Sequence, residues 1–167
     1  MSAGVEQVCQ AMADYLNKQG VPAAVAWPGR PRQEQKETLA VVSLRGCQAE
    51  TAAFQDYLGE RYDDRTGRWT EWYGRRARLT LGLDLYAPEG GDGQAVQRAF
   101  DALAGALILG GPEGLRVEEF SCGQTAYDPD SRRLMRPVQA VCGAWLCAAA
   151  GTDGAFTDFE LRGVIEA

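Results

Sequence analysis

The sequence predicts an α+β fold in which two helices pack on one mostly antiparallel β-sheet, with a projecting β-hairpin arm. Leucines alternate with mostly polar residues over 79–85, which is typical of a strand with one buried face. After a glycine-rich turn the spacing becomes helical, with Val96, Phe100, Leu103 and Leu107 on one stripe. Strand-like segments separated by turn residues flank this unit on both sides. Together these observations predict helices segregated to one face of a sheet.

The N-terminal third predicts one helix and two strands. Residues 3–19 carry an apolar stripe at helical spacing, and Gly20 is suited to the left-handed position that ends a helix. Strands are expected at 21–27 and 39–44. Residues 47–59 can begin a helix or contain a short strand, and both interpretations stay open.

Residues 59–76 predict a projecting hairpin or long loop that is rich in arginine and aromatic residues. Turn-forming residues at 63–67 separate its two halves. Either the aromatic side chains pack on the domain, or the arm binds a partner, because aromatic residues and arginine are enriched at interfaces. In the second case we expect the two tryptophans to contribute more to assembly than to folding. The candidate partner-binding residues of the arm are Arg61, Tyr62, Arg65, Arg68, Trp69, Trp72, Tyr73 and Arg75.

The C-terminal part predicts a long hairpin and a last strand. Strands are expected at 115–127, 135–149 and 156–165. The strand over 135–149 is apolar on both faces, although a strand with water on one side should be polar on that side. Another segment or a neighbouring subunit is therefore expected to cover its second face, and Val141 and Trp145 join the candidate partner-binding residues.

The residue types give no positive indication of catalysis, a cofactor or a metal site. Histidine is absent, which removes the commonest general base and any Ser–His or Cys–His pair. The turn at 90–93 lacks the Gly-Lys-Ser/Thr of a phosphate-binding loop, and the five cysteines form no Cys-x-x-Cys pair. We expect reduced, mostly buried thiols, with a Cys122–Cys142 disulfide as the alternative. The prediction is a protein that is not an enzyme.

Length and charge limit the class of protein. A chain of 167 residues is expected to form a single domain, 1–167. The net charge of −6 argues against a non-specific nucleic-acid binder. No apolar run is long enough to span a bilayer, and the N-terminal residues lack the pattern of a signal peptide. Synthesis in the cytoplasm, without a membrane partner, is therefore expected.

The order of these features resembles that of tail-terminator (tail-completion) proteins of tailed bacteriophages and phage-like contractile particles. The resemblance rests on the N-terminal amphipathic helix, the strand WYGRRARLTLGLDLYAP over 72–88, the helix bearing FDALAGAL over 100–107 and the hairpin YDPDSRRLMRPVQAV over 127–141. It covers nearly the whole chain, about 5–165, and concerns pattern and element order.

The resemblance implies a structural protein that forms a homo-hexameric ring on the tail tube. Such a ring ends polymerisation of tube and sheath and offers a surface for neck attachment. The implied partners are other copies of the chain, the tail tube protein and, in contractile particles, sheath and neck or connector proteins. Assembly in the host bacterial cytoplasm and a final position at the neck end of a virion or phage-like tail follow. An acidic ring could let DNA pass without specific binding.

Two alternatives stay open. One is a neck or head–tail connector, or a tube-like subunit, of the same particle. The other is a small α+β ligand-binding domain or enzyme. That alternative requires a pocket with converging polar groups, for which Asp84, Tyr86 and Glu119 are the candidates.

Overall fold

A computed structural model describes residues 7–25, 37–88 and 90–150, together with the backbone of 156–162. These residues form two α-helices, one short 3₁₀ helix and nine strands. In chain order the elements are α1 (Val8–Lys18), β1 (Ala23–Val25), β2 (Leu39–Thr51), the 3₁₀ helix η2 (Phe54–Asp56), β3 (Tyr57–Asp63), β4 (Arg68–Tyr86), α2 (Gly93–Leu109), β5 (Arg116–Cys122), β6 (Ala126–Asp128), β7 (Arg133–Arg136), β8 (Val138–Ala150) and β9 (Phe156–Arg162).

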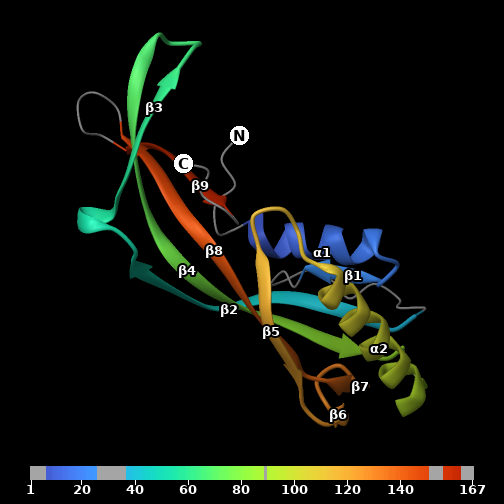
Figure 1. Cartoon of the computed structure of the whole chain (residues 1–167). Coiled ribbons are helices and arrows are strands. Elements are labelled where there is room, and N and C mark those ends of the chain that lie inside the picture. Colours follow the sequence, from blue (N-terminus) through green and yellow to red (C-terminus); the bar gives the residue numbers. More distant parts are fainter. Residues whose placement is uncertain (1–6, 26–36, 89, 151–155, 163–167) are drawn as a thin grey trace.

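The described strands form one sheet that is antiparallel except where β1 pairs with β2. β4 is its long central strand: it pairs with β2, with β8 and, at its N-terminal end, with β3. β5 and β9 pair with β8, and the short strands β6 and β7 pair with each other beside the end of β4. In Figure 1, β4 runs from the arm at the top to the helices at the lower right. The predicted α+β fold is confirmed.

One hydrophobic core lies between the sheet and the two helices. All four leucines at 79–85 are at most 1% exposed, as the alternation predicts. Both helices contribute buried side chains to this core, and Tyr15 Oη of α1 donates a 2.7 Å hydrogen bond to Ala106 O of α2. Both helices therefore cover the same face of the sheet, and the opposite face has no described helix on it. Burying one leucine stabilises the fold by about 1.5–3 kcal/mol.

The helix ends follow from local chemistry. Gly20 adopts a φ of +81°, and the N–H groups of Gly20 and Val21 donate to carbonyls in the last turn of α1. The helix-ending role expected for Gly20 is confirmed. In the glycine-rich turn, Asp92 caps α2 by accepting a 2.8 Å hydrogen bond from the N–H of Ala95. This turn therefore serves as a strand-to-helix connection.

Two expected boundaries in the N-terminal half are wrong or incomplete. The strand expected at 39–44 continues to Thr51, because a bulge at Arg45 restores its pairing with β4. The ambiguous segment 47–59 forms the end of β2, the 3₁₀ helix and the start of β3. The parts of expected elements at 3–6, 26–27 and 163–165 lie outside the described residues.

The predicted C-terminal hairpin is divided into two pairs of strands. β5 pairs with β8, and β6 pairs with β7. The division lies where the N–H of Gly123 donates to the carbonyl of Pro137 at 2.9 Å. Because proline has no N–H to donate to a ladder, the strand expected at 135–149 becomes β7 and β8.

Candidate functional site

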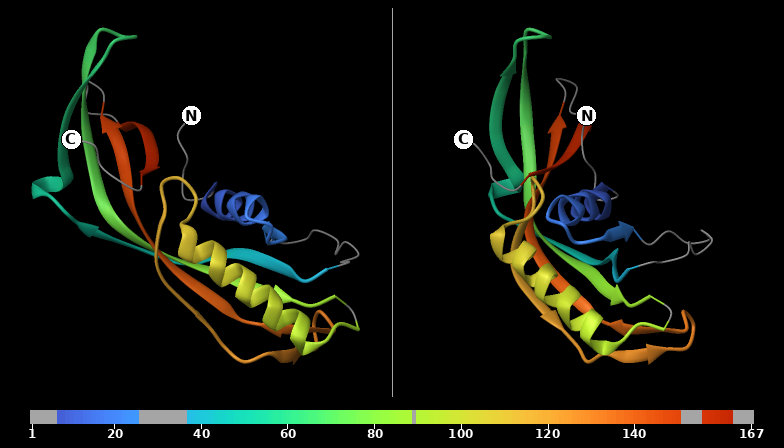
Figure 2. Two further views of the ribbon diagram at one scale, coloured as in Figure 1. Left: turned by 45° about the vertical axis from the view of Figure 1, so that its right-hand side comes forward. Right: turned by 90° about the vertical axis from the view of Figure 1, so that its right-hand side faces the viewer.

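The arm predicted at 59–76 is a hairpin of β3 and the N-terminal part of β4, and it projects beyond the helices (Figures 1 and 2). Asp63 holds its turn: Oδ1 accepts from the N–H of Arg65 at 2.9 Å, and its carbonyl accepts from the N–H of Gly67 at 2.8 Å. The backbone hydrogen bond from Arg65 lowers the pKa of Asp63, so the turn is held by an ionised acceptor. No arm residue belongs to the described core under the helices. The turn of the hairpin is thus held by local interactions, while residues 71–76 of β4 at the base of the arm also pair with β8.

One face of the arm carries two aromatic pairs that join its strands. Tyr62 meets Trp69 edge-on with 5.4 Å between ring centroids, and Tyr57 meets Tyr73 at 5.6 Å. Despite its contact, Trp69 remains 61% exposed. Such pairs contribute about 0.5–1.5 kcal/mol each beyond area burial. They stabilise the hairpin while leaving much aromatic surface accessible.

Two carboxylates lie between these pairs on the same face. Glu60 and Glu71 are directly opposite each other in the register of β3 and β4, and both are exposed. Tyr73 Oη donates to Glu71 Oε2 at 2.9 Å, and this bond raises the pKa of Tyr73. Partial desolvation and the charges of both glutamates raise the pKa of Tyr57. We call this surface the aromatic–acidic face; its residues are Tyr57, Glu60, Tyr62, Trp69, Glu71 and Tyr73.

The opposite face of the arm is basic near its tip and apolar at its base. Arg61 and Arg68 are exposed there, because β-strand side chains alternate between faces. Toward the base, Leu58 covers Gly74: a Cβ on Gly74 would lie 2.7 Å from Leu58 Cδ1 and 3.1 Å from Cys147 Sγ. Near Cys147, a segment of the same chain therefore covers the second face of β8. This was one of the two expectations for the strand at 135–149, the other being a neighbouring subunit.

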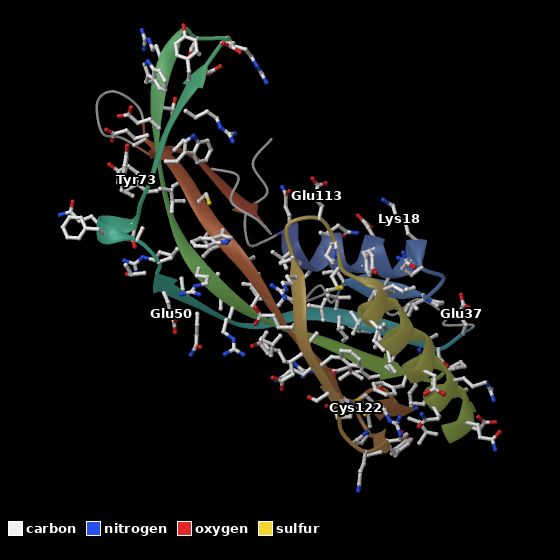
Figure 3. The ribbon with its side chains drawn as sticks, viewed as in Figure 1. Lys18, Glu37, Glu50, Tyr73, Glu113 and Cys122 are labelled. Atoms are coloured by element: carbon white, nitrogen blue, oxygen red, sulfur yellow. The ribbon has the colours of Figure 1, made fainter. Side chains whose placement is uncertain are left out.

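Val141 and Trp145 lie on the open face of the sheet, opposite the helices, and both are half-buried. Trp145 lines a groove across four strands, which we call the open-face groove. Its lining residues are Gln48, Glu50, Arg76, Ala77, Arg78, Arg116, Glu118, Gly143, Ala144 and Trp145. Figure 3 shows Glu50 of this groove far from the helices, and Tyr73 at the base of the arm.

Charges of both signs line the open-face groove. The carboxylate of Glu118 occupies the space above Gly143 and lies 4.0 Å from Arg78 Nε. Arg76 and Arg116 form no ion pair with any residue that the structure describes. The groove therefore presents guanidinium groups that an acidic partner could bind.

The structure distributes the predicted partner-binding residues over several surfaces. Tyr62, Trp69 and Tyr73 come together on the aromatic–acidic face, whereas Trp72 is half-buried on the opposite side of β4. Arg75 is held at the base of the arm by an ion pair with Asp56, 2.8 Å from Nε to Oδ2. The remaining members are Arg65 in the turn, Arg61 and Arg68 on the basic face, and Val141 and Trp145 on the open face of the sheet.

Sequence reasoning missed Tyr57, Glu60 and Glu71 in the arm and most residues of the open-face groove. The alternation of Trp69, Glu71 and Tyr73 was a usable signal, since it places three side chains on one face. Their cross-strand neighbours carried no such signal, because the start of β3 lay in the ambiguous segment. The groove residues come from four strands and share no motif.

Asp84, named for the ligand-binding alternative, takes part in the framework. Its Oδ2 lies 2.6 Å from Arg45 Nη2, and its Oδ1 accepts from the N–H of Val138 at 3.1 Å. Neither Asp84, Tyr86 nor Glu119 lines the open-face groove.

In the described part of the chain, no group of three His, Cys, Asp or Glu side chains is placed to hold a metal ion. None of the helices described is both long and apolar enough to cross a membrane.

The cysteines are dispersed through the fold as free thiols. Three of the five are buried, so the expectation of mostly buried thiols is confirmed. Cys122 and Cys142 lie on the paired strands β5 and β8 but are not opposite each other. Their positions give no support to the alternative of a disulfide.

Comparison with known proteins finds similarity among solved structures. No family model and no curated protein matches the sequence. Among solved structures, the chain is similar to the sheath/tube terminator of an extracellular contractile injection system, PVC, in its extended state, solved by cryo-electron microscopy. The TM-score is 0.47 and the sequence identity 13%, over 100% of this chain and 63% of that one. The chain thus spans less than two thirds of the length of that neighbour.

Proposed function

We propose that the protein is a structural assembly protein, not an enzyme, and that it acts as a tail terminator. In this role several copies, six by the family resemblance, form a ring on a tail tube and end polymerisation of tube and sheath. The observation that carries the proposal is the projecting arm, whose aromatic side chains lie outside the hydrophobic core and include the exposed Tyr57, Tyr62 and Trp69. An arm of this kind provides contact surface beyond the core of the body.

Two different surfaces support the ring. A head-to-tail contact requires two non-identical patches on each subunit, and it closes into a ring when the rotation between neighbours closes. The arm and the open-face groove are two such patches, one of them on the projecting hairpin and the other on the body of the sheet.

The proposed partners follow from this role. They are other copies of the chain, the tail tube protein and, in a contractile particle, sheath and neck or connector proteins. Copies would assemble in the bacterial cytoplasm and remain at the neck end of the tail. The net charge of −6 suits a ring through which DNA passes without binding.

Deleting the gene for this protein tests the proposed function, because loss of a terminator changes tail length. Electron microscopy of particles from the deleted strain is expected to show tubes of excessive and variable length, with normal length restored by the full chain. Tails of normal length that lack heads would instead assign the chain to the connector class. In a particle without a head, unchanged tail length alone would contradict the proposal.

A further inference from the structure

We propose that the aromatic–acidic face of the arm binds an arginine of a neighbouring copy, and that this arginine comes from the neighbour's open-face groove. The inference rests on the proposed ring and names the contact between its subunits. The groove arginines are Arg76, Arg78 and Arg116.

The two opposed glutamates carry the first step of the argument. Glu60 and Glu71 face each other across the hairpin, and like charges placed directly opposite destabilise a pair of strands. Among the described residues, neither carboxylate forms an ion pair. A guanidinium group between them would replace this repulsion with two attractions. The isolated subunit therefore presents an unneutralised acidic site.

The aromatic pairs favour arginine as the cation. Tyr62 and Trp69 lie on one side of the carboxylates along the strands, and Tyr57 and Tyr73 lie on the other. Side chains two residues apart on a strand are separated by about 6–7 Å, so a bound guanidinium can reach a ring as well as a carboxylate. A planar guanidinium both pairs with carboxylates and stacks on aromatic rings, which an ammonium group does less well.

An arginine of the groove can reach the aromatic–acidic face only from a second copy of the chain. β4 pairs with β8 without a register shift from Glu71 to Gly82, so its side chains alternate regularly. Glu71 therefore points to the face that carries the helices, whereas Arg76 and Arg78 point to the open face. A subunit cannot place its own arm face on its own groove. The contact joins different patches of two copies, which is the head-to-tail arrangement.

A charge-exchange experiment with the full-length chain tests this contact. Sedimentation equilibrium of the wild type is expected to show self-association that weakens as sodium chloride is raised. Glu60→Lys with Glu71→Lys should weaken it about tenfold or more, and Arg76→Glu with Arg116→Glu should do the same. Mixing the two double variants should restore association, because each altered surface then meets a complementary one.

A matched control separates the contact from net charge. Asp101→Lys with Glu113→Lys changes the net charge by the same amount as the double variant of the arm, but on exposed sites outside the arm and the groove. It should leave association at the wild-type level. Circular dichroism of every variant checks the fold. A wild type that stays monomeric at every soluble concentration, arm reversals without effect, or a mixture without recovery would each overturn the inference.

The tail-length assay keeps the two proposals distinguishable. If the deletion gives overlong tails but the charge exchange fails, the terminator function stands and this contact is wrong. If the charge exchange succeeds while the deletion leaves tail length unchanged, the contact stands and the terminator function is wrong.

Discussion

Three strand glycines each lie beneath a side chain from a neighbouring part of the chain. The side chain occupies the space that a Cβ would fill, as is common where chain segments approach closely. The covering pairs are Leu58 over Gly74, Arg45 over Gly82 and Glu118 over Gly143. Because all three glycines are on the open face, side chains rather than a helix cover parts of that face.

Replacing Gly82 tests this arrangement. A Cβ there would lie 2.6 Å from both Arg45 Nε and Ser43 Oγ, so Gly82→Ala should displace Arg45 from its ion pair with Asp84. Both atoms belong to flexible side chains that can move, so we expect the free energy of unfolding in urea to fall by only about 0.5–1 kcal/mol, mainly through the lost ion pair. Gly105→Ala is the matched control, since apart from its chain neighbours and the backbone of its own helix nothing lies within 4 Å of a Cβ at this site. It should raise stability by up to about 1 kcal/mol; equal effects of the two substitutions would contradict the prediction.

The thiol of Cys142 predicts a loss of stability at alkaline pH. Burial, with a smaller contribution from the charge of Glu118, raises the pKa of Cys142 from 9.0 to about 11. Between these values the unfolded state has lost the proton and the folded state keeps it, so the unfolded state binds fewer protons. The free energy of unfolding should therefore fall as pH rises from about 9 to about 11, by on the order of 2 kcal/mol.

Urea denaturation of wild type and Cys142→Ala across this pH range isolates the effect. The tyrosines of the arm titrate in both proteins, so the difference between the two curves reports the thiol. We expect the wild type to lose stability more steeply than the variant. Parallel curves would show that the Cys142 thiol titrates alike in the folded and unfolded states.

At the scale of elements, the arm separates its two tryptophans. The sequence led us to expect both to contribute more to assembly than to folding. Trp69 is 61% exposed at the arm tip, whereas Trp72 is half-buried and shares its face with Gly74 and Leu58. The two strand faces therefore give these residues different environments.

Alanine substitutions should follow this difference. Trp69→Ala loses its contact with Tyr62 and should cost about 0.5–1.5 kcal/mol of folding stability, while weakening self-association clearly. Trp72→Ala removes partly buried apolar surface and should cost more folding stability, about 2–3 kcal/mol. Chemical denaturation and sedimentation measure the two effects. Equal losses of stability would mean that burial does not distinguish the two sites.

For the molecule as a whole, the core was predictable and the sites on its surface were predictable only in part. Strict alternation over 79–85 and helical spacing in α2 follow directly from burial on one face, and both are local in sequence. The length of β2 was not predictable in this way, because the bulge at Arg45 changes which residues face the core. The arm was indicated by the turn-forming residues at 63–67 and by the arginine-rich, aromatic composition on either side of them.

The pairing of residues inside the arm could not be predicted from local sequence patterns. The Glu60–Glu71 opposition depends on the register of β3 against β4 and on the irregularity between Tyr57 and Gly59. Neither follows from period-two spacing, which gives a face but no partner. The open-face groove requires four strands to be aligned, so its arginines could be identified only from the assembled sheet.

The separation of arm and core predicts that the arm can be removed from a folded domain. Gly59 and Trp72 are opposite each other, so replacing residues 60–71 with Asn-Gly creates a two-residue hairpin turn of a favoured type. The core under the helices contains no residue of 57–76, so the melting temperature should change by only a few degrees. The shortened chain should nevertheless remain monomeric where the full chain associates, and it should not restore normal tail length. A shortened chain that fails to fold would show that the arm stabilises the body, and one that restores tail length would remove the arm from the terminator function.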